Sequence, residues 1–233
     1  KVSVGADGLI VLERSDRADF RWQFFNADGS VAEMCGNGGR CAARYAFLRG
    51  IAPARMTFET LAGIIDAEVK EDTVKLRLTD PGEAKIGEKI DVNGRTLEID
   101  SIDTGVPHAV HFVKDFGEID IFGDGRAIRR HGHFQPAGTN VNFVRAVDRR
   151  SLQVRTYERG VEDETLACGT GSVASALVAS ARNLVESPVA VTVQSGEVLT
   201  IFFEKTKKGF AGIYLEGGTK VVYEGNLWEE AYR

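Results

Sequence analysis

Two short loops of the sequence place a cysteine directly before a glycine and a helix-forming segment. They are Cys35-Gly36-Asn37-Gly38 and Cys168-Gly169-Thr170-Gly171. A thiol at the start of a helix lies beside unpaired N–H groups and the positive end of the helix dipole, which together favour a thiolate. Glycine lets a ligand approach the backbone closely, so the same N–H groups could hold a carboxylate. One such loop would indicate only a tight turn into a helix, whereas two in matching contexts predict a shared chemical task.

Two opposed thiols suit the inversion of a carbon that carries an acidic proton. One thiolate would remove the α-proton from one face while the other thiol delivers a proton to the opposite face. Helix N–H groups on the substrate carboxylate would stabilise the charge that develops. The sequence has neither a Gly-x-Gly-x-x-Gly segment after a strand nor a Walker loop, so we expect the reaction to need no cofactor.

Other uses of the cysteines are open on the residues alone. A disulfide between Cys35 and Cys168 would be an oxidised, inactive state. A Cys–His nucleophile for acyl transfer, with His108 as its base, would use only one of the matched cysteines. A zinc site would need more ligands than the isolated pair in His131-Gly132-His133. Cys41 is expected to be a small buried residue.

The elements that must position the two loops repeat along the chain. Each loop follows a strand-like segment and a polar stretch, and each is followed by a helix rich in small residues. The spacing from Phe20 to Cys35 nearly equals the spacing from Leu152 to Cys168. The next strand-like segment begins equally far after each cysteine, at residues 56 and 189. This order predicts a duplication that places two similar loops face to face across a cleft.

The coarse secondary structure predicts an α+β fold with more strands than helices. Strands are expected near residues 9–12, 20–24, 56–59, 64–69, 74–78, 97–102, 109–113, 141–144, 152–157, 189–193, 198–203 and 212–215. Helices are expected near residues 38–49, 124–130 and 171–182. The helices are few and rich in alanine, which favours sheets wrapped around helices with small side chains.

Composition excludes several classes of protein. The 233 residues are 43% hydrophobic and 27% charged, which indicates a globular chain with one large domain or two smaller ones. A net charge of −5 argues against a nucleic-acid partner. No apolar run is as long as a bilayer-spanning helix requires, so we expect no membrane span. Three cysteines, an odd number, indicate a reducing compartment and thus the cytoplasm.

The residues around both cysteines resemble the two signatures of the diaminopimelate epimerase family. The first signature is Glu33-Met34-Cys35-Gly36-Asn37-Gly38-Gly39-Arg40-Cys41. The second is Glu158-Arg159-Gly160 followed by Thr165-Leu166-Ala167-Cys168-Gly169-Thr170-Gly171. Residues 4–8, 26–30 and 223–225 match the family pattern as well, so the resemblance covers nearly the whole chain. It implies an isomerase, independent of pyridoxal phosphate and metal, that interconverts LL- and meso-2,6-diaminopimelate for lysine and peptidoglycan biosynthesis.

The resemblance also implies a role for each matching residue. Cys35 and Cys168 would be the two acid/base thiols, and His108 and Glu158 would tune their protonation. The reacting carboxylate would be held by Gly36, Asn37, Gly169 and Thr170, and the distal end of the substrate by Asn26, Asn140, Glu158 and Arg159. Turn chemistry alone would make Asn26 a turn residue. Without the resemblance, Asn140 and Asn142 would bond a strand end, Glu158 and Arg159 would be a solvated pair, and His108 would be a structural loop histidine.

The implied fold has two pseudo-symmetric domains, each a mixed sheet curled around a central helix, with the active site between them. We expect the first at residues 1–80 plus 218–233 and the second at residues 81–217. Two departures from the family pattern matter. Val106 occupies the place of a substrate-binding asparagine in Gly105-Val106-Pro107-His108. A segment with another such asparagine, in a Gly-Asn-Asp-Phe loop, is expected before Lys1.

Two rival functions remain on the same scaffold. The related proline racemases and hydroxyproline epimerases share the two-thiol chemistry, but their first motif typically has histidine where this chain has Asn37, and their second lacks Glu-Arg-Gly. A binding protein that has lost catalysis is disfavoured because both Cys35 and Cys168 are present. The expected partner is a small amino-acid substrate. The sequence does not decide the oligomeric state and leaves a homodimer open.

Overall fold

The computed structural model describes residues 5–6, 8–31 and 35–231. Val4, Asp7, Glu33 and Met34, which belong to the motifs named above, lie outside the described residues. The chain divides into two compact units, one of Lys1–Leu76 with Gly218–Arg233 and one of Arg77–Gly217. We call them unit 1 and unit 2.

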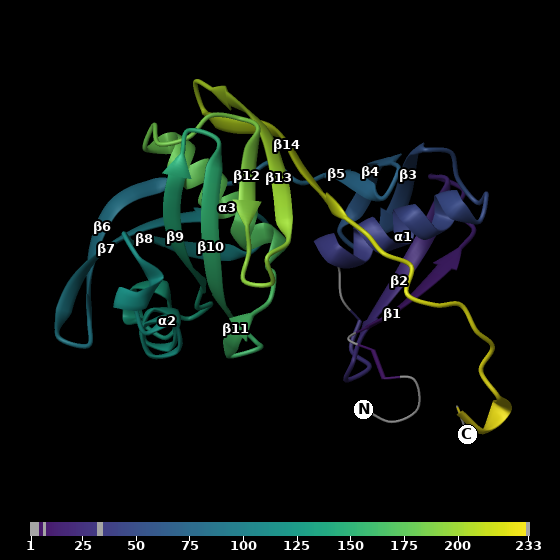
Figure 1. The fold of residues 1–233 in the computed structure, drawn as a ribbon, viewed down its shortest axis with the longest axis horizontal. Coiled ribbons are helices and arrows are strands. Elements are labelled where there is room, and N and C mark those ends of the chain that lie inside the picture. The colour runs from purple at the N-terminus through teal and green to yellow at the C-terminus, as the bar shows by residue number, and fades with distance from the viewer. Residues whose placement is uncertain (1–4, 7, 32–34, 232–233) are drawn as a thin grey trace. The chain divides into compact units, whose positions relative to one another are not determined.

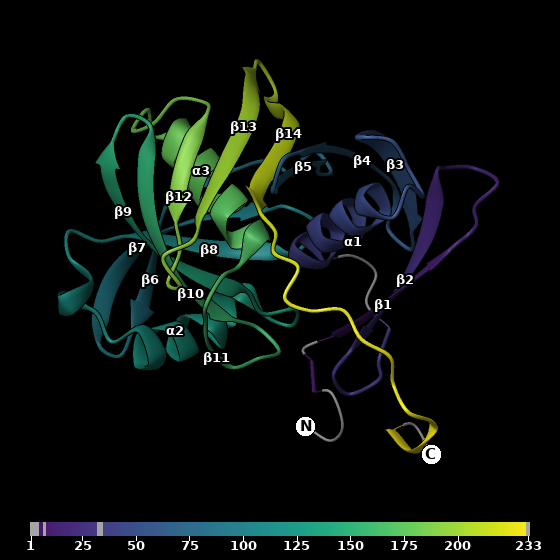
Figure 2. The same cartoon turned by 45° about the vertical axis from the view of Figure 1, so that its right-hand side comes forward.

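The described residues of unit 1 form a five-stranded sheet with one α-helix. Its strands follow one another in the order β1 to β5, with β2 and β3 parallel and the other neighbours antiparallel. The elements are β1 (Gly8–Glu13), β2 (Phe20–Asn26), α1 (Gly36–Leu48), β3 (Arg55–Thr60), β4 (Gly63–Lys70) and β5 (Thr73–Arg77), with a short 3-10 helix at Glu229–Ala231. The helix packs through Ala42, Ala43 and Ala46, and these small side chains let it lie close to β4 (Figure 2).

Unit 2 is a larger mixed sheet with two α-helices. Its strands run in the order β14-β13-β12-β10-β9-β8-β7-β6, with β11 paired to β10. The elements are β6 (Lys85–Val92), β7 (Arg95–Asp103), β8 (Pro107–Phe112), α2 (Ile121–Arg129), β9 (Asn140–Asp148), β10 (Ser151–Glu158), β11 (Asp163–Thr165), α3 (Gly169–Ala181), β12 (Val189–Thr192), β13 (Val198–Thr206) and β14 (Gly209–Gly218). Short 3-10 helices lie at Phe116–Glu118 and Gly132–Phe134.

The sheet of unit 2 curls around α3, while α2 packs on the other face of β9 and β10 (Figure 1). Every residue of α3 from Gly171 to Ser180 is buried. A helix that is buried all round must be apolar or small on every side, and this one consists of Ala, Val, Leu, Gly and Ser at those positions. Two of its serines bond back to the backbone: Ser172 Oγ donates to the carbonyl of Cys168 at 2.9 Å and Ser175 Oγ to that of Gly171 at 2.7 Å.

The repeat expected from the sequence is present in the strand pairing. In unit 1, β2 leads through α1 to a parallel β3, and Phe20 pairs with Phe58. In unit 2, β10 leads through α3 to a parallel β12, and Leu152 pairs with Val191. In both units the next strand is antiparallel. The mixed α+β class is therefore confirmed, with one cysteine loop in each copy of the repeat.

Several details differ from the sequence prediction, including the unexpected three-residue strand β11. Helices α1 and α3 begin at Gly36 and Gly169, ahead of the expected starts, because each cysteine itself caps its helix. Strand β6 was not expected: it is an edge strand whose mostly exposed, charged residues give little apolar alternation. The expectation that Cys41 is buried is wrong, since its side chain is exposed on α1. Within the part of the chain that the structure describes, no helix is both long and apolar enough to cross a membrane.

Candidate active site

Both signature cysteines are the N-cap residues of the helices that follow them. Cys35 and Cys168 have extended backbones, as an N-cap requires. The Sγ atom of Cys35 accepts a hydrogen bond from the backbone N–H of Gly38 at 3.5 Å. The Sγ atom of Cys168 accepts one from the N–H of Gly171 at 3.4 Å. Each sulfur thus lies at the positive end of a 13-residue helix, in the same local geometry.

The first helical residues after each cysteine provide N–H groups for an anion. Gly36 and Asn37 start α1, and Gly169 and Thr170 start α3. Their N–H groups precede the first hydrogen bond of the helix and are the groups that a helix N-terminus offers to a carboxylate. Neither α1 nor α3 carries an acidic side chain in its first turn, so no carboxylate of those turns competes for these donors.

Two side chains in these loops contact their own helix. The hydroxyl of Thr170 lies 3.6 Å from the Sγ atom of Cys168. The side-chain oxygen of Asn37 accepts a hydrogen bond from Nη1 of the buried Arg40 at 3.1 Å. Thr170 therefore borders a thiol directly, while the side chain of Asn37 is held against α1.

His108 is a buried strand residue and not a loop histidine. It lies in β8 opposite Asn140 of the parallel strand β9, and only 1% of it is exposed. Burial, and then the positive charge of Arg159, lower the pKa of His108 from 6.5 to about 3. The imidazole is consequently neutral at physiological pH.

Glu158 ends β10 and is only partly exposed. Burial raises the pKa of its carboxyl above the usual value, because the charged form loses hydration. A carboxyl with a raised pKa can exchange a proton nearer neutrality than an exposed glutamate can.

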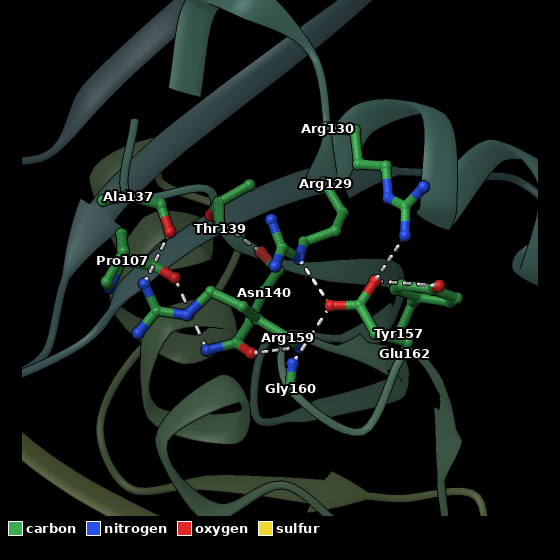
Figure 3. A network of polar contacts seen from close by, with 10 residues as sticks. All are labelled: Pro107, Arg129, Arg130, Ala137, Thr139, Asn140, Tyr157, Arg159, Gly160 and Glu162. Carbon is green, nitrogen blue, oxygen red and sulfur yellow. Dashed lines mark hydrogen bonds and ion pairs between the residues drawn. The ribbon is translucent and has the colours of Figure 1, made fainter. Parts of the chain in front are cut away.

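Asn140 and Arg159 are brought together at the end of β10 (Figure 3). The side-chain oxygen of Asn140 accepts a hydrogen bond from the backbone N–H of Arg159 at 2.9 Å. The guanidinium of Arg159 donates to the carbonyl of Ala137 at 2.9 Å. Unit 2 thus assembles His108, Asn140, Glu158 and Arg159 from three neighbouring strands and the turn after them.

Glu162 anchors that turn and is not among the site residues predicted from the sequence. Its Oε1 atom accepts from the N–H of Gly160 at 3.1 Å and from Nε of Arg129 at 2.9 Å (Figure 3). Its Oε2 atom accepts from the hydroxyl of Tyr157 at 3.4 Å and lies 3.8 Å from Arg130. The acidic residue soon after a strand-ending Glu-Arg pair was the available signal, but its arginine partners come from the C-terminal end of α2.

Asn26 ends β2 and is exposed in the turn that follows it. Its backbone N–H donates to the carbonyl of Ser30 at 2.8 Å, and its side-chain nitrogen donates to the Ser30 hydroxyl at 3.0 Å. The structure therefore shows Asn26 as a turn residue, and its proposed contact with substrate would require this amide to exchange partners.

The third cysteine and the histidine pair do not form a further site. Among the described residues, no three His, Cys, Asp or Glu side chains are grouped so as to hold a metal ion. His133 lies 3.4 Å from Glu88, and Nδ1 of His131 accepts from the N–H of His133. None of Cys35, Cys41 and Cys168 is in a disulfide.

Comparison with known proteins matches the chain to the family model described as diaminopimelate epimerase, over residues 1–86 and 101–222. A diaminopimelate epimerase of Aquifex aeolicus is 52% identical over 97% of this chain and 82% of its own length. That of Archaeoglobus fulgidus is 44% identical over 96% of this chain and 81% of its own length.

Solved structures share the fold at low sequence identity. A hydroxyproline epimerase from Agrobacterium vitis, solved with trans-4-hydroxy-L-proline, has a TM-score of 0.66 at 18% identity and covers 92% of this chain and 74% of its own. A PhzF-family phenazine biosynthesis protein of Bacillus anthracis has a TM-score of 0.70 at 18% identity and covers 92% of this chain and 82% of its own. At this level of identity, these structures support a shared fold alone.

Proposed function

The chain belongs to the diaminopimelate epimerase family, and from that premise we propose that it interconverts LL- and meso-2,6-diaminopimelate. The observation that carries the proposal is the pair of N-cap cysteines, each with its sulfur at the N-terminus of a helix. Curated relatives at 52% and 44% identity carry the same name, which supports this substrate over the proline-type substrates of the structural neighbours.

In the proposed reaction, Cys35 and Cys168 act on one α-carbon. The thiolate of one removes the α-proton, and the thiol of the other adds a proton on the opposite face. The turnover leaves the two cysteines with exchanged protonation states, so a proton must pass through solvent before the next turnover in the same direction. The N–H groups of Gly36, Asn37, Gly169 and Thr170 would hold the substrate carboxylate and stabilise its charge as the carbon ionises.

The other residues would select and orient the substrate. The guanidinium of Arg159 can pair with the distal carboxylate, and the carboxylate of Glu158 with the distal ammonium. Asn140 supports the distal end by holding the backbone of Arg159, and Asn26 would add an amide from unit 1. His108 and Glu158 would tune the protonation of the thiols. We place the reaction in the cytoplasm, because the mechanism requires both thiols to be reduced.

The proposal is tested by replacing each cysteine in the full-length protein. We expect Cys35→Ala and Cys168→Ala each to lower kcat by at least about 100-fold, the lower end of what a positioned acid or base contributes. The assay follows epimerisation of LL-diaminopimelate and uptake of solvent deuterium at the α-carbon, without added metal or pyridoxal phosphate. L-proline serves as the rival substrate.

Cys41→Ala is the matched control, because Cys41 lies on the same helix as Cys35 but is exposed. It should retain epimerisation. Wild-type activity in Cys35→Ala or in Cys168→Ala would refute the two-thiol mechanism. Turnover of L-proline in place of diaminopimelate would refute the proposed substrate.

A further inference from the structure

Asn142 is a buried amide in the middle of an apolar strand. It is 0% exposed and lies in β9 between Val141 and Phe143. Its side-chain nitrogen is 3.1 Å from Nδ1 of His108 and 3.0 Å from the carbonyl oxygen of Ala109. Its side-chain oxygen accepts a hydrogen bond from the hydroxyl of Thr156 at 2.9 Å. A polar group this deeply buried is stable only when it is paired, and here three bonds join it to β8 and β10.

These contacts determine where the proton of His108 lies. The carbonyl of Ala109 can only accept, so the atom of Asn142 beside it must be the NH₂ group. One hydrogen of that group goes to Ala109 and the other to Nδ1 of His108, which therefore acts as an acceptor. In a neutral imidazole the other nitrogen then carries the proton. His108 is held as its Nε2–H tautomer.

The surroundings keep this imidazole neutral. Burial disfavours a positive charge on the ring, and the guanidinium of Arg159 opposes one as well. His108 also lines a cavity of about 250 Å³ whose other titratable residues are Glu83, Lys85, Asp103 and His133. The Nε2 atom itself is buried and has no hydrogen-bond partner among the described residues. The Nε2–H group is thus a donor without an acceptor in this part of the protein.

The side-chain amide of Asn142 also lies beside the loop that carries Cys168 at the start of α3. A Cβ atom placed on Gly171 would lie 2.4 Å from the side-chain oxygen of Asn142. It would lie 3.2 Å both from the hydroxyl of Thr156 and from the Sγ atom of Cys168. Asn142 thus bonds to His108 in β8 and packs against Gly171, whose N–H group donates to the Sγ atom of Cys168.

We propose that Asn142 is a positioning residue: its amide fixes the buried imidazole of His108 as the Nε2–H tautomer and prevents Nδ1 from taking a proton. Its part in catalysis rests on the epimerase function proposed above, in which His108 would tune the protonation of the thiols. The tautomer itself is a property of the folded protein and can be measured without any reaction.

The first test is ¹⁵N NMR of the histidine rings in the labelled, full-length protein. The chain has four histidines, and the signals of His108 are identified by their loss in His108→Gln. We expect an unprotonated Nδ1 and a protonated Nε2 that do not change between pH 5 and 8. A protonated Nδ1, or a ring that titrates in this range, would overturn the proposal even if every Asn142 variant failed to fold.

The second test uses Asn142→Asp with Thr156→Val as its matched control. The carboxylate can only accept, so it should draw the proton to Nδ1 and raise the pKa of His108 into the measurable range. We expect kcat to fall by roughly 10- to 100-fold, less than the ~10²–10³ lost with a direct oxyanion-hole donor, and its pH profile to follow the new titration of His108. Thr156→Val removes the hydroxyl on the other side of the amide and should keep the wild-type tautomer.

The outcomes separate this proposal from the proposed function. Wild-type kcat and pH profile in a folded Asn142→Asp would overturn the positioning role, as would an inverted tautomer in Thr156→Val. Wild-type protein that shows the expected ring signals but never epimerises diaminopimelate would instead refute the proposed function, and with it the catalytic part of this inference.

Discussion

The glycine at the third position of α3 is predicted to be essential for packing as well as for the helix start. In Gly171→Ala, the new methyl would lie 2.4 Å from the side-chain oxygen of Asn142, more than 1 Å inside the ~3.5 Å of an ordinary contact. Asn142 is buried and bonded on three sides, so it cannot move aside without breaking a hydrogen bond.

The expected change in the free energy of unfolding of Gly171→Ala is the sum of three contributions. Overpacking a dense interior costs about 1–3 kcal/mol, and one buried polar atom left unpaired adds about 1–3 kcal/mol. Alanine in a helix returns roughly 0.5–1 kcal/mol relative to glycine. We therefore expect the free energy of unfolding to fall by roughly 1–5 kcal/mol, measured by urea denaturation.

Gly169→Ala is the control, because its methyl would meet only the end of the Leu215 side chain, at 3.2 Å. The end of a leucine can rotate, so the change in the free energy of unfolding should stay below about 1 kcal/mol. If Gly171→Ala proved as stable as Gly169→Ala, the inferred packing of Asn142 against α3 would be refuted.

Three further predictions concern ionisable side chains of unit 2. The pKa of His108 is lowered from 6.5 to about 3, so between these values the unfolded chain binds a proton that the folded chain does not. This proton should make stability decrease as the pH falls through the window, by up to ~1.4 kcal/mol per unit, and urea titrations should show a shallower slope in His108→Gln. Arg182→Ala removes the cation that pairs with the buried carboxylate of Asp100 and leaves this charge with the N–H of Gly87 as its partner. The loss should cost about 3–5 kcal/mol of unfolding free energy, against less than ~1 kcal/mol for Arg149→Ala in an exposed ion pair. Glu162→Ala releases the turn after β10 and should raise KM for diaminopimelate about 10-fold with little change in kcat, since it supports only proposed distal contacts; an unchanged KM in steady-state assays would contradict this.

The sequence identified the features that depend on local chemistry. A cysteine followed by glycines at a helix start has a meaning that does not require the rest of the fold, and both cysteines are indeed N-caps. The strand–helix–strand repeat was likewise visible, because each copy occupies a short stretch of chain. Periodicity could also have corrected the expectation for Cys41: with about 3.6 residues per turn, it lies opposite the stripe of Ala42, Ala43 and Ala46.

The features that were missed depend on contacts between distant segments. Asn142 has a role only because β8 and β10 flank β9, which brings His108 and Thr156 to its two ends. Glu162 was missed for the same reason, since Arg129 reaches it from α2. Spacing along the chain carries no information on such partners. His108 was placed in a loop because Pro107 precedes it, but proline is tolerated as the first residue of a strand, as it is in β8.

The two thiol loops have the same backbone geometry but different surroundings, and the difference fits the proposed substrate. Inversion of a carbon requires acid/base chemistry from both cysteines. This shared requirement explains why both are N-cap residues with the same hydrogen-bond geometry. The distal half of diaminopimelate is not inverted and needs only one fixed set of contacts. Apart from Asn26, the residues proposed for it, Asn140, Glu158 and Arg159, all belong to unit 2, where Glu162 and α2 brace them. Selection among amino acids should therefore depend mainly on unit 2, while the loop at Cys35 acts on the reacting α-carbon and its carboxylate.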